Sequence, residues 1–228
     1  MAKTYSIAID GPAGAGAGKS TIAKALAKEL GYQYVDTGAI YRTVAYFLDL
    51  LGVSPKDVDG VERYIDELNV DIEYDETGKQ HMIMNGMDVS DEIRTQDISQ
   101  KASLVSAHKV VRDVLLDMQR DVAKKHNVIM DGRDIGTVVL PDATVKIFLT
   151  ATAEVRAQRR TDEMIAKGQK ADFEQTLKDI KQRDHQDSTR PIAPLKQAED
   201  AVLLDTSEMD IPTVLEEMKK IISKKIAL

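Results

Sequence analysis

The chain has 228 residues, of which 43% are hydrophobic and 30% are charged, and its formal net charge is −7. This length can bury a full core, and it fits one large domain or one domain that carries an insertion. The balance of apolar and charged residues is that of a globular protein and excludes a disordered chain. The acidic net charge argues against a broad surface for nucleic acid, so we expect no nucleic-acid partner.

The same composition excludes two further classes of protein. No apolar run approaches the ~20 residues of a membrane-spanning helix, and the first residues lack the pattern of a signal peptide. We therefore expect a cytoplasmic protein without a membrane partner. Cysteine is absent, which rules out disulfides, thiolate catalysis and cysteine metal sites. The four histidines lack the spacing of metal ligands.

The amino-terminal region predicts a strand, a helix and a second strand. Residues 5–9 alternate β-branched and small residues and read as the first strand. Apolar side chains then recur every fourth position from Ile22 to Leu30, and Gly31 ends this helix. Residues 32–35 form a short second strand.

The middle of the chain departs from this alternation. Ser54 and Pro55 predict a helix start, with serine as the cap and proline in the first turn. Residues 70–74 and 81–84 alternate apolar with polar side chains around a turn at 75–78, which is typical of a hairpin with one solvated face. Val110 to Val122 then return to helical spacing. A small antiparallel module is thus inserted between two strands of the main sheet.

The carboxyl-terminal half resumes the first pattern. Residues 128–130, 145–149 and 201–204 are too apolar to be solvated on one face, so we expect three parallel strands that are buried on both faces. A closing helix has its inner face at Ile211, Val214, Leu215, Met218, Ile221 and Ile222. The sequence therefore predicts an α/β fold with a parallel five-stranded sheet covered by helices.

The stretch DGPAGAGAGKST, residues 10–21, lies between the first strand and the first helix. A loop that ends Gly-Lys-Ser before a helix presents backbone N–H groups to a phosphate at the positive end of the helix dipole. Lys19 adds charge for the β- and γ-phosphates, and the Ser20 hydroxyl is suited to Mg²⁺. The alternative is a flexible Gly-Ala turn that merely caps the helix.

The loop is two residues longer than the usual spacing. Counting back from Gly18 places Ala13 where glycine is expected, and counting forward from Gly11 places Ala17 where lysine is expected. Two residues are up to ~7 Å of backbone. We expect a bulge at residues 11–13 and a preserved phosphate cradle, because amides next to Lys19 supply most of the attraction. The predicted ATP-binding residues are Gly14, Ala15, Gly16, Ala17, Gly18, Lys19, Ser20 and Thr21.

A second candidate motif follows the strand at 128–130. Asp131 ends an apolar strand, a position that in phosphate-loop folds holds Mg²⁺ through water. Arg133 and Asp134 come next, at the strand end where open α/β sheets bind ligands. The alternative is a strand-end turn with a surface ion pair.

The chain resembles bacterial cytidylate kinases, of the nucleoside monophosphate kinase family of P-loop proteins. The matching pieces extend over nearly the whole length; they are IDGP at 9–12, GKST at 18–21, DTGAIYR at 36–42, EIR at 92–94, DGRDIGTVV at 131–139, KIFL at 146–149, Arg156, Arg159, Arg160, Arg183, Asp184, Asp187, Arg190 and APL at 193–195. The departure is the loop, which carries one additional Gly-Ala unit.

The resemblance implies a P-loop NTPase-type core, an antiparallel β/helix insertion that binds the nucleoside monophosphate, and an arginine-rich helical lid. The corresponding ranges are 1–40, 110–152 and 191–228 for the core, 41–109 for the insertion and 153–190 for the lid. The CMP-binding positions implied are Thr37, Tyr41, Arg42, Ser103, Arg112, Arg133, Asp134, Arg183, Asp187 and Arg190. Among them, Ser103, Arg112 and Asp134 match positions that read cytosine. On helices, Arg42 and Arg112 could instead be merely solvated.

The expected reaction is in-line transfer of the ATP γ-phosphoryl group to CMP or dCMP, with Mg²⁺ carried by ATP and held by Ser20 and by Asp131 through water. The catalytic residues predicted are Lys19, Arg133, Arg159, Arg160 and Arg190. They carry charge stabilisation only, because the acceptor is already an anion. We expect a monomer. Three alternatives stay open: a GTP-binding switch, a nucleic-acid-binding ATPase, and a kinase-shaped protein whose longer loop impairs catalysis.

Overall fold

The computed structural model describes residues 4–12 and 18–226. Its centre is a parallel five-stranded sheet with the order β2-β6-β1-β7-β8. The strands are β1 (Ser6–Asp10), β2 (Gln33–Asp36), β6 (Val128–Gly132), β7 (Val145–Thr150) and β8 (Val202–Asp205). All of these pairings are parallel, so the carboxyl ends of the strands share one edge. This sheet confirms the predicted fold class.

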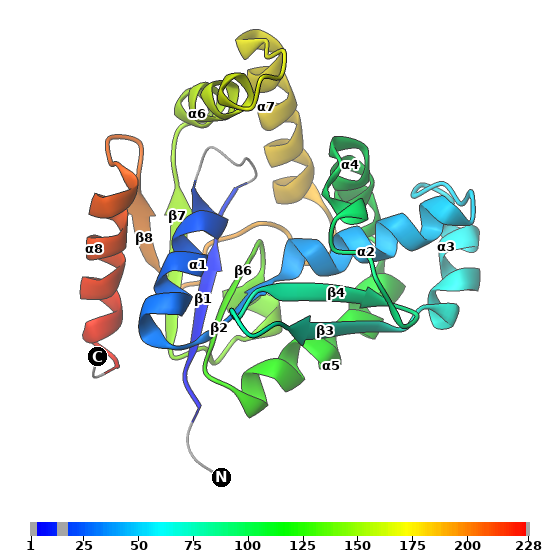
Figure 1. Ribbon diagram of the computed structural model, residues 1–228, viewed down its shortest axis with the longest axis horizontal. Coiled ribbons are helices and arrows are strands. Elements are labelled where there is room, and N and C mark those ends of the chain that lie inside the picture. Colours follow the sequence, from blue (N-terminus) through cyan, green and yellow to red (C-terminus); the bar gives the residue numbers. More distant parts are fainter. Residues whose placement is uncertain (1–3, 13–17, 227–228) are drawn as a thin grey trace.

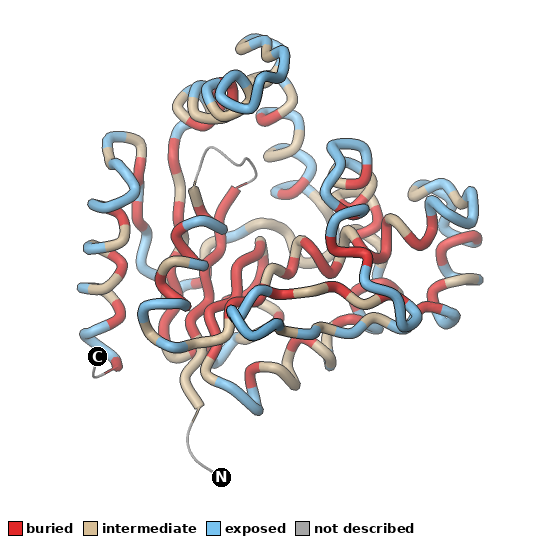
Figure 2. The backbone as a smooth tube through the Cα atoms, in the orientation of Figure 1, coloured by how far each residue is buried: buried red, intermediate tan, exposed pale blue. Residues whose placement is uncertain are grey.

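Two layers of helices cover the sheet (Figure 1). One face packs against α1 (Lys19–Leu30) and α8 (Ile211–Ser223), with Ile7, Ile9 and Ile147 in the shared core. The other face packs against α2 (Thr37–Leu50) and α5 (Lys109–Lys125). Figure 2 shows the buried strands between these layers.

The insertion between β2 and β6 contains the predicted hairpin. It is a three-stranded antiparallel sheet of β3 (Val70–Tyr74), β4 (Gln80–Met84) and β5 (Met87–Asp88). Alternate residues of β4 are buried, which is the predicted pattern of one solvated face. The insertion also contains α3 (Val58–Tyr64), α4 (Gln96–Val105) and two single turns of 3-10 helix at Ile65–Glu67 and Glu92–Arg94.

The remaining elements follow the third core strand. A π-helical turn, Ile135–Val139, comes directly after β6. The helices α6 (Ala153–Ala166) and α7 (Phe173–Thr189) pack on each other as a hairpin that stands over the sheet edge (Figure 1). This hairpin occupies the segment where the sequence predicted a lid.

Two local predictions are corrected. The helix predicted from Ser54 begins instead at Val58, because the Asp57 carboxylate accepts the Gly60 N–H at 3.1 Å and is the cap. The buried stripe of α5 runs through Val111, Leu115 and Ala123. Val114 lies on the neighbouring row of this helix and is 42% exposed.

The second correction concerns β8. The sequence predicted a strand buried on both faces, but Val202 and Leu203 are 43% and 55% exposed. Since β8 is the last strand of the sheet, it has a neighbour on one side only, and of its side chains only Leu204 is buried, in the core cluster with α8.

Candidate active site

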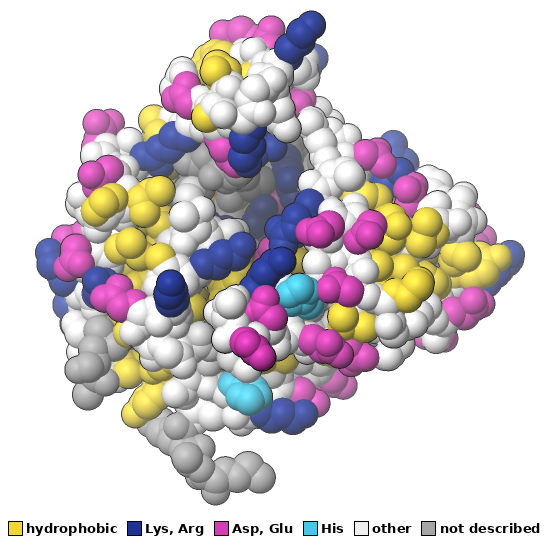
Figure 3. Space-filling view, viewed as in Figure 1, with side chains coloured by type: hydrophobic (Ala, Val, Ile, Leu, Met, Phe, Trp, Pro, Cys, Tyr) yellow, Lys and Arg dark blue, Asp and Glu magenta, His cyan; other side chains and the backbone are white. Residues whose placement is uncertain are grey.

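A cavity of about 930 Å³ opens at the carboxyl edge of the central sheet, beneath the lid. Figure 3 shows this hollow, with Lys and Arg side chains on its walls. The predicted site residues that line it are Gly18, Lys19, Ser20, Thr21, Thr37, Tyr41, Arg42, Ser103, Asp131, Arg133, Asp134, Arg159, Arg183, Asp187 and Arg190. We call the side with Lys19, Ser20 and Asp131 the donor half. The acceptor half is the side with Arg42, Arg133, Arg183 and Arg190, together with Arg112, which contacts the cavity through Asp134.

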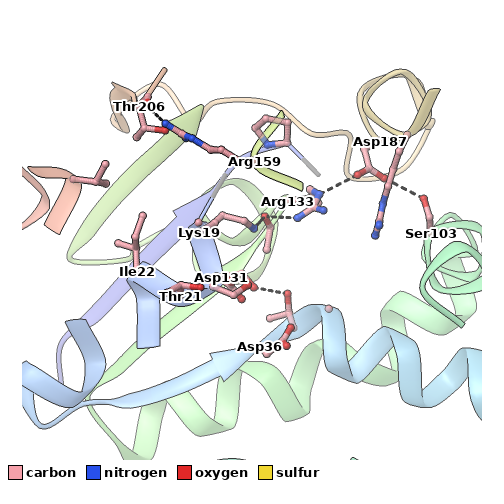
Figure 4. Close-up of a pocket in the computed structure, with 18 of the residues that line it drawn as sticks. Lys19, Thr21, Ile22, Asp36, Ser103, Asp131, Arg133, Arg159, Asp187 and Thr206 are labelled. Atoms are coloured by element: carbon pink, nitrogen blue, oxygen red, sulfur yellow. Dashed lines mark hydrogen bonds and ion pairs between the residues drawn. The ribbon is translucent and has the colours of Figure 1, made fainter. Parts of the chain in front are cut away.

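Lys19 is the central cation of the donor half. Gly18 adopts a left-handed conformation with φ 65° and starts α1, which places Lys19 at the first helical position. The Lys19 Nζ donates to the carbonyl of Gly132 at 2.6 Å, across the sheet edge (Figure 4). Burial, together with the nearby Arg133, lowers the pKa of Lys19 to about 8. The ammonium is thus desolvated and pre-positioned for an anion.

Ser20 and Asp131 form the second feature of the donor half. The Ser20 hydroxyl donates to the Asp131 carboxylate at 2.7 Å, and the Tyr34 hydroxyl donates to its other oxygen at 3.1 Å. The Thr37 hydroxyl donates to the backbone carbonyl of Asp131 at 2.7 Å. Burial raises the pKa of Asp131. These contacts fix two oxygen groups beside Lys19.

The phosphate loop is described only at its two ends. Gly14, Ala15, Gly16 and Ala17, the predicted cradle, lie outside the described residues, as does Ala13 of the predicted bulge. At the strand side, Gly11 packs on β7 so closely that an added Cβ atom would lie 2.1 Å from the Leu149 carbonyl oxygen. Only glycine permits this approach.

Carboxylates hold most arginines of the acceptor half. Arg42 Nη2 lies 3.0 Å from Asp36, whose other oxygen accepts the Ala39 N–H and so caps α2. Arg133 Nε donates to Asp187 at 2.9 Å, and Ser103 donates to the same carboxylate at 3.3 Å (Figure 4). Asp187 therefore connects the lid helix α7 to the end of β6 and to α4.

Asp134 holds two arginines at once. Arg112 donates to one of its oxygens, and Arg190 Nη2 lies 3.3 Å from the other. Arg190 Nη1 also donates to the Ser106 hydroxyl at 3.1 Å. Arg112 itself lies behind Asp134 and outside the cavity lining, so it contacts the cavity through that carboxylate.

Arg183 differs from the other acceptor arginines. Its Nε is buried and has no hydrogen-bond partner among the described residues. Burial, with repulsion from Arg133 and Arg42, lowers the pKa of Arg183 to about 10. It is a desolvated cation beside other cations, which is the environment that an anionic ligand relieves.

The remaining arginines of the lid have separate surroundings. Arg159 Nη2 donates to the carbonyls of Thr206 and Met209 at 2.8 and 2.9 Å, in the loop between β8 and α8. Arg160 lies 3.2 Å from Glu163 on its own helix, outside the cavity lining. Arg156 is bound by Asp184 of α7. The sequence grouped these three arginines, but the structure divides them between the cavity wall, the surface and the packing of the lid.

Comparison with known proteins decides the family. The family model described as cytidylate kinase matches residues 7–224. A cytidylate kinase from Exiguobacterium sp. is 46% identical over 224 residues, which are 98% of this chain and 99% of the relative. A cytidylate kinase from Bacillus cereus (strain G9842) is 47% identical over 226 residues, or 98% of each chain. The chain belongs to the cytidylate kinase family.

Membership in the cytidylate kinase family confirms the predicted enzyme class, a nucleoside monophosphate kinase. The alternative of impaired catalysis finds no support in these comparisons. An uncharacterised protein from Eubacterium ventriosum has a similar fold, with a TM-score of 0.50 and 15% identity over 96% of this chain and 99% of that chain. Within residues 4–12 and 18–226, no helix has both the length and the hydropathy to cross a membrane.

Sequence reasoning missed one wall of the cavity. This wall consists of Ile22, Thr206, Met209, Asp210, Ile211, Pro212 and Val214. Most of it is the loop after β8 and the start of α8, to which Arg159 donates hydrogen bonds. The signal was present, because Asp210 and Pro212 mark a helix start directly after a parallel strand. Asp36 and Ser106 were missed as well, although Asp36 follows a predicted strand as Asp131 does and begins the DTGAIYR motif.

Proposed function

We propose that this protein transfers the γ-phosphoryl group of ATP to the phosphate of CMP or dCMP and releases ADP. One observation carries the proposal. The acceptor half contains five arginines and three carboxylates, Asp36, Asp134 and Asp187, and so has two positive charges in excess. A phosphate monoester carries ≈ −1.5 to −2 charges at pH 7. The excess positive charge of the acceptor half therefore matches the negative charge of a nucleoside monophosphate.

The donor half complements this arrangement. Lys19 and the amides at the start of α1 suit the β- and γ-phosphates of ATP. Arg159 and the apolar wall formed by Ile22, Ile211 and Pro212 provide a flat surface for the adenine ring. Arg133 follows Gly132, whose carbonyl accepts from Lys19 at 2.6 Å. The two halves thus meet where the transferred group would pass.

The chemistry needs no protein nucleophile. An oxygen of the acceptor phosphate bonds to the γ-phosphorus, the bond from that phosphorus to the β,γ-bridging oxygen breaks, and the electron pair leaves with ADP. Because the acceptor oxygen is already anionic, no general base is required. Lys19, Arg133 and Arg190 stabilise the charge spread over the transferred oxygens.

The residues of the donor half fit Mg²⁺. Oxygen donors suit this ion, and the Ser20 hydroxyl and the Asp131 carboxylate lie 2.7 Å apart. Of the residues described, no group of three or more histidine, cysteine or acidic side chains could hold a metal. In the proposal the ion arrives on the nucleotide and, when bound, would neutralise charge on the phosphates. A cytoplasmic monomer acting on free nucleotides is part of the proposal.

A coupled assay that measures ADP release tests the proposal. ATP and Mg²⁺ are supplied with CMP, dCMP, UMP or AMP as the acceptor. We expect kcat/KM for CMP or dCMP to exceed that for AMP by about 100-fold or more, since a site built to hydrogen-bond one base rejects an analogue without its partners. Binding of CMP without transfer would contradict the proposal and favour the impaired protein.

A further inference from the structure

Asp10 is a buried carboxylate that the proposed reaction does not use. It is the last residue of β1 and is 4% exposed. Its two oxygens accept the backbone N–H groups of Ile135 and Gly136, each at 2.7 Å. Among the described residues, none forms an ion pair with Asp10 within 4.0 Å. Both carboxylate oxygens thus accept hydrogen bonds from two consecutive amides, which lie 125 and 126 residues away in the chain.

These two amides begin the π-helical turn at Ile135–Val139. The first N–H groups of a helical turn have no acceptor within the turn and are normally capped by the residue that precedes it. Here that residue is Asp134, whose side chain makes no capping hydrogen bond. Its carboxylate instead binds Arg112 and Arg190. Asp10 therefore performs for this turn the capping that Asp134 would otherwise perform.

The turn is also held from its other side. A Cβ atom added at Gly136 would lie 3.3 Å from an Asp10 oxygen and 3.1 Å from Cδ of Lys146. Lys146 is a buried residue of β7 whose Nζ donates to Asp200 at 2.8 Å. The turn thus packs between side chains of β1 and β7. Because Asp134 directly precedes this turn, a shift of the turn at Asp10 also shifts Asp134.

We propose that Asp10 is a specificity-positioning residue. By capping the turn from β1, it leaves the Asp134 carboxylate free to orient Arg112 and Arg190 at the acceptor half. Without this cap, Asp134 is the nearest acidic group to the uncapped amides and turns away from the arginines. This inference rests on the proposed function and on the expectation, from the sequence resemblance, that Asp134 and Arg112 read the base of the acceptor.

Asp10→Asn tests the inference with little change in shape. The amide keeps one acceptor oxygen but directs its NH₂ group at the second backbone N–H. We expect the KM for CMP to rise about tenfold, and the ratio of kcat/KM for CMP over UMP to fall by a similar factor. The KM for ATP should change by less than about threefold, because β1 remains paired on both sides.

Asp57→Asn is the matched control, since Asp57 also caps a helix, outside the cavity lining. It should leave both KM values and the CMP-to-UMP ratio unchanged. If Asp10→Asn lowers the melting temperature and activity with all acceptors equally, the role is structural and the inference is overturned. A wild-type protein with no preference for CMP would instead overturn the proposed function.

Gly136→Ala provides a second test if Asp10→Asn does not fold. The added methyl group displaces the turn without changing the chemistry of Asp10. We expect a KM for CMP about threefold higher, in the same direction as Asp10→Asn, with the KM for ATP unchanged. An unaltered KM and CMP-to-UMP ratio in a folded Gly136→Ala protein would overturn the inference.

Discussion

The donor and acceptor halves of the cavity hold their cations in different ways. In the donor half, Lys19 and Arg159 donate to backbone carbonyls of Gly132, Thr206 and Met209. In the acceptor half, Arg42, Arg133 and Arg190 are bound by carboxylates. Neutral carbonyls orient a cation and leave its charge available. Carboxylates neutralise that charge, which lets several arginines share one buried space.

Arg183 is the exception in the acceptor half. Burial acts to raise the pKa of Asp187, but Arg133 and Arg183 outweigh it and lower that pKa. Yet the Arg183 Nε has no hydrogen-bond partner in the described part of the chain, and the pKa of Arg183 is lowered to about 10. The acceptor half therefore stores unfavourable electrostatic energy, which binding of the acceptor phosphate would release.

The largest effect is expected in the donor half, at Lys19→Met. Removing the buried cation beside the transferred group should lower kcat about 10³-fold or more. The dissociation constant of CMP should stay within about threefold, since the acceptor arginines are unchanged. Steady-state kinetics and calorimetric titration with CMP measure the two quantities.

Lys28→Met is the control for this change, because Lys28 lies on the same helix and is exposed. It should retain wild-type turnover. If Lys19→Met also kept its turnover, Lys19 would not be the donor cation and the assignment of the two halves would fail.

Arg183→Met tests the stored energy of the acceptor half. We expect the KM for CMP to rise about 10- to 100-fold, as for the loss of one charged hydrogen bond to phosphate. Because Arg183 is desolvated and its Nε has no hydrogen-bond partner among the described residues, its removal should raise the melting temperature without nucleotide. Thermal unfolding with and without CMP measures both effects.

The exposed Arg63 of α3 offers the matched change, Arg63→Met, which should alter neither value. A lower melting temperature for Arg183→Met together with an unchanged KM for CMP would show that Arg183 is a structural cation. Arg183 would then no longer differ from the other arginines of the acceptor half, which are held by carboxylates.

Gly11→Ala tests the backbone on which the donor half rests. The new methyl group would lie 2.1 Å from the Leu149 carbonyl oxygen, so β7 or the loop must move. We expect about 2 kcal/mol of destabilisation, or a melting temperature lower by about 4–8 °C. The KM for ATP should rise more than the KM for CMP.

Gly52→Ala separates this steric effect from the cost of a left-handed backbone alone. Gly52 has φ 68° and open space around its Cα. Its replacement should cost about 1 kcal/mol and leave both KM values unchanged. Equal effects of the two changes on ATP binding would rule out a special role for the contact with Leu149.

The smallest effect concerns paired charge outside both halves. On the exposed face of the hairpin, His81 lies 2.7 Å from Asp88 and 3.3 Å from Asp75. The hydrogen bonds to Asp88 and Asp75 raise the pKa of His81. The stabilisation is therefore complete below the unfolded pKa of ~6.5 and is lost as the pH rises through the higher folded pKa.

We thus expect wild type to have a higher melting temperature than His81→Gln, and we expect this difference to be larger near pH 6 than near pH 9. His126→Gln, at an exposed histidine outside the hairpin, serves as the control. A difference that is the same at both pH values would contradict the pairing. We expect the difference near pH 6 to be small, because exposed pairs contribute about 0–1 kcal/mol.

Local patterns were sufficient for most of the secondary structure. The strands at β1 and β6 and the hairpin at β3 and β4 follow from periodicity and turn residues that lie within a few positions of each other. The start of α3 was placed too early, since Ser54 and Asp57 are both good caps and only packing selects between them. The exposure of β8 depends on its place at the sheet edge, which no local pattern specifies.

The sequence by itself determined the family, the fold class and the positions of the charged residues, because these depend on short motifs and on spacing along the chain. Only the tertiary structure decided which carboxylate holds which arginine, since the pairs of Arg133 with Asp187 and of Arg112 with Asp134 span 54 and 22 residues. It also separated Arg159 from Arg160 and joined Asp10 to the turn after Asp134. Such contacts depend on the order of strands in the sheet and on what each side chain meets there, and neither is a local property of the chain.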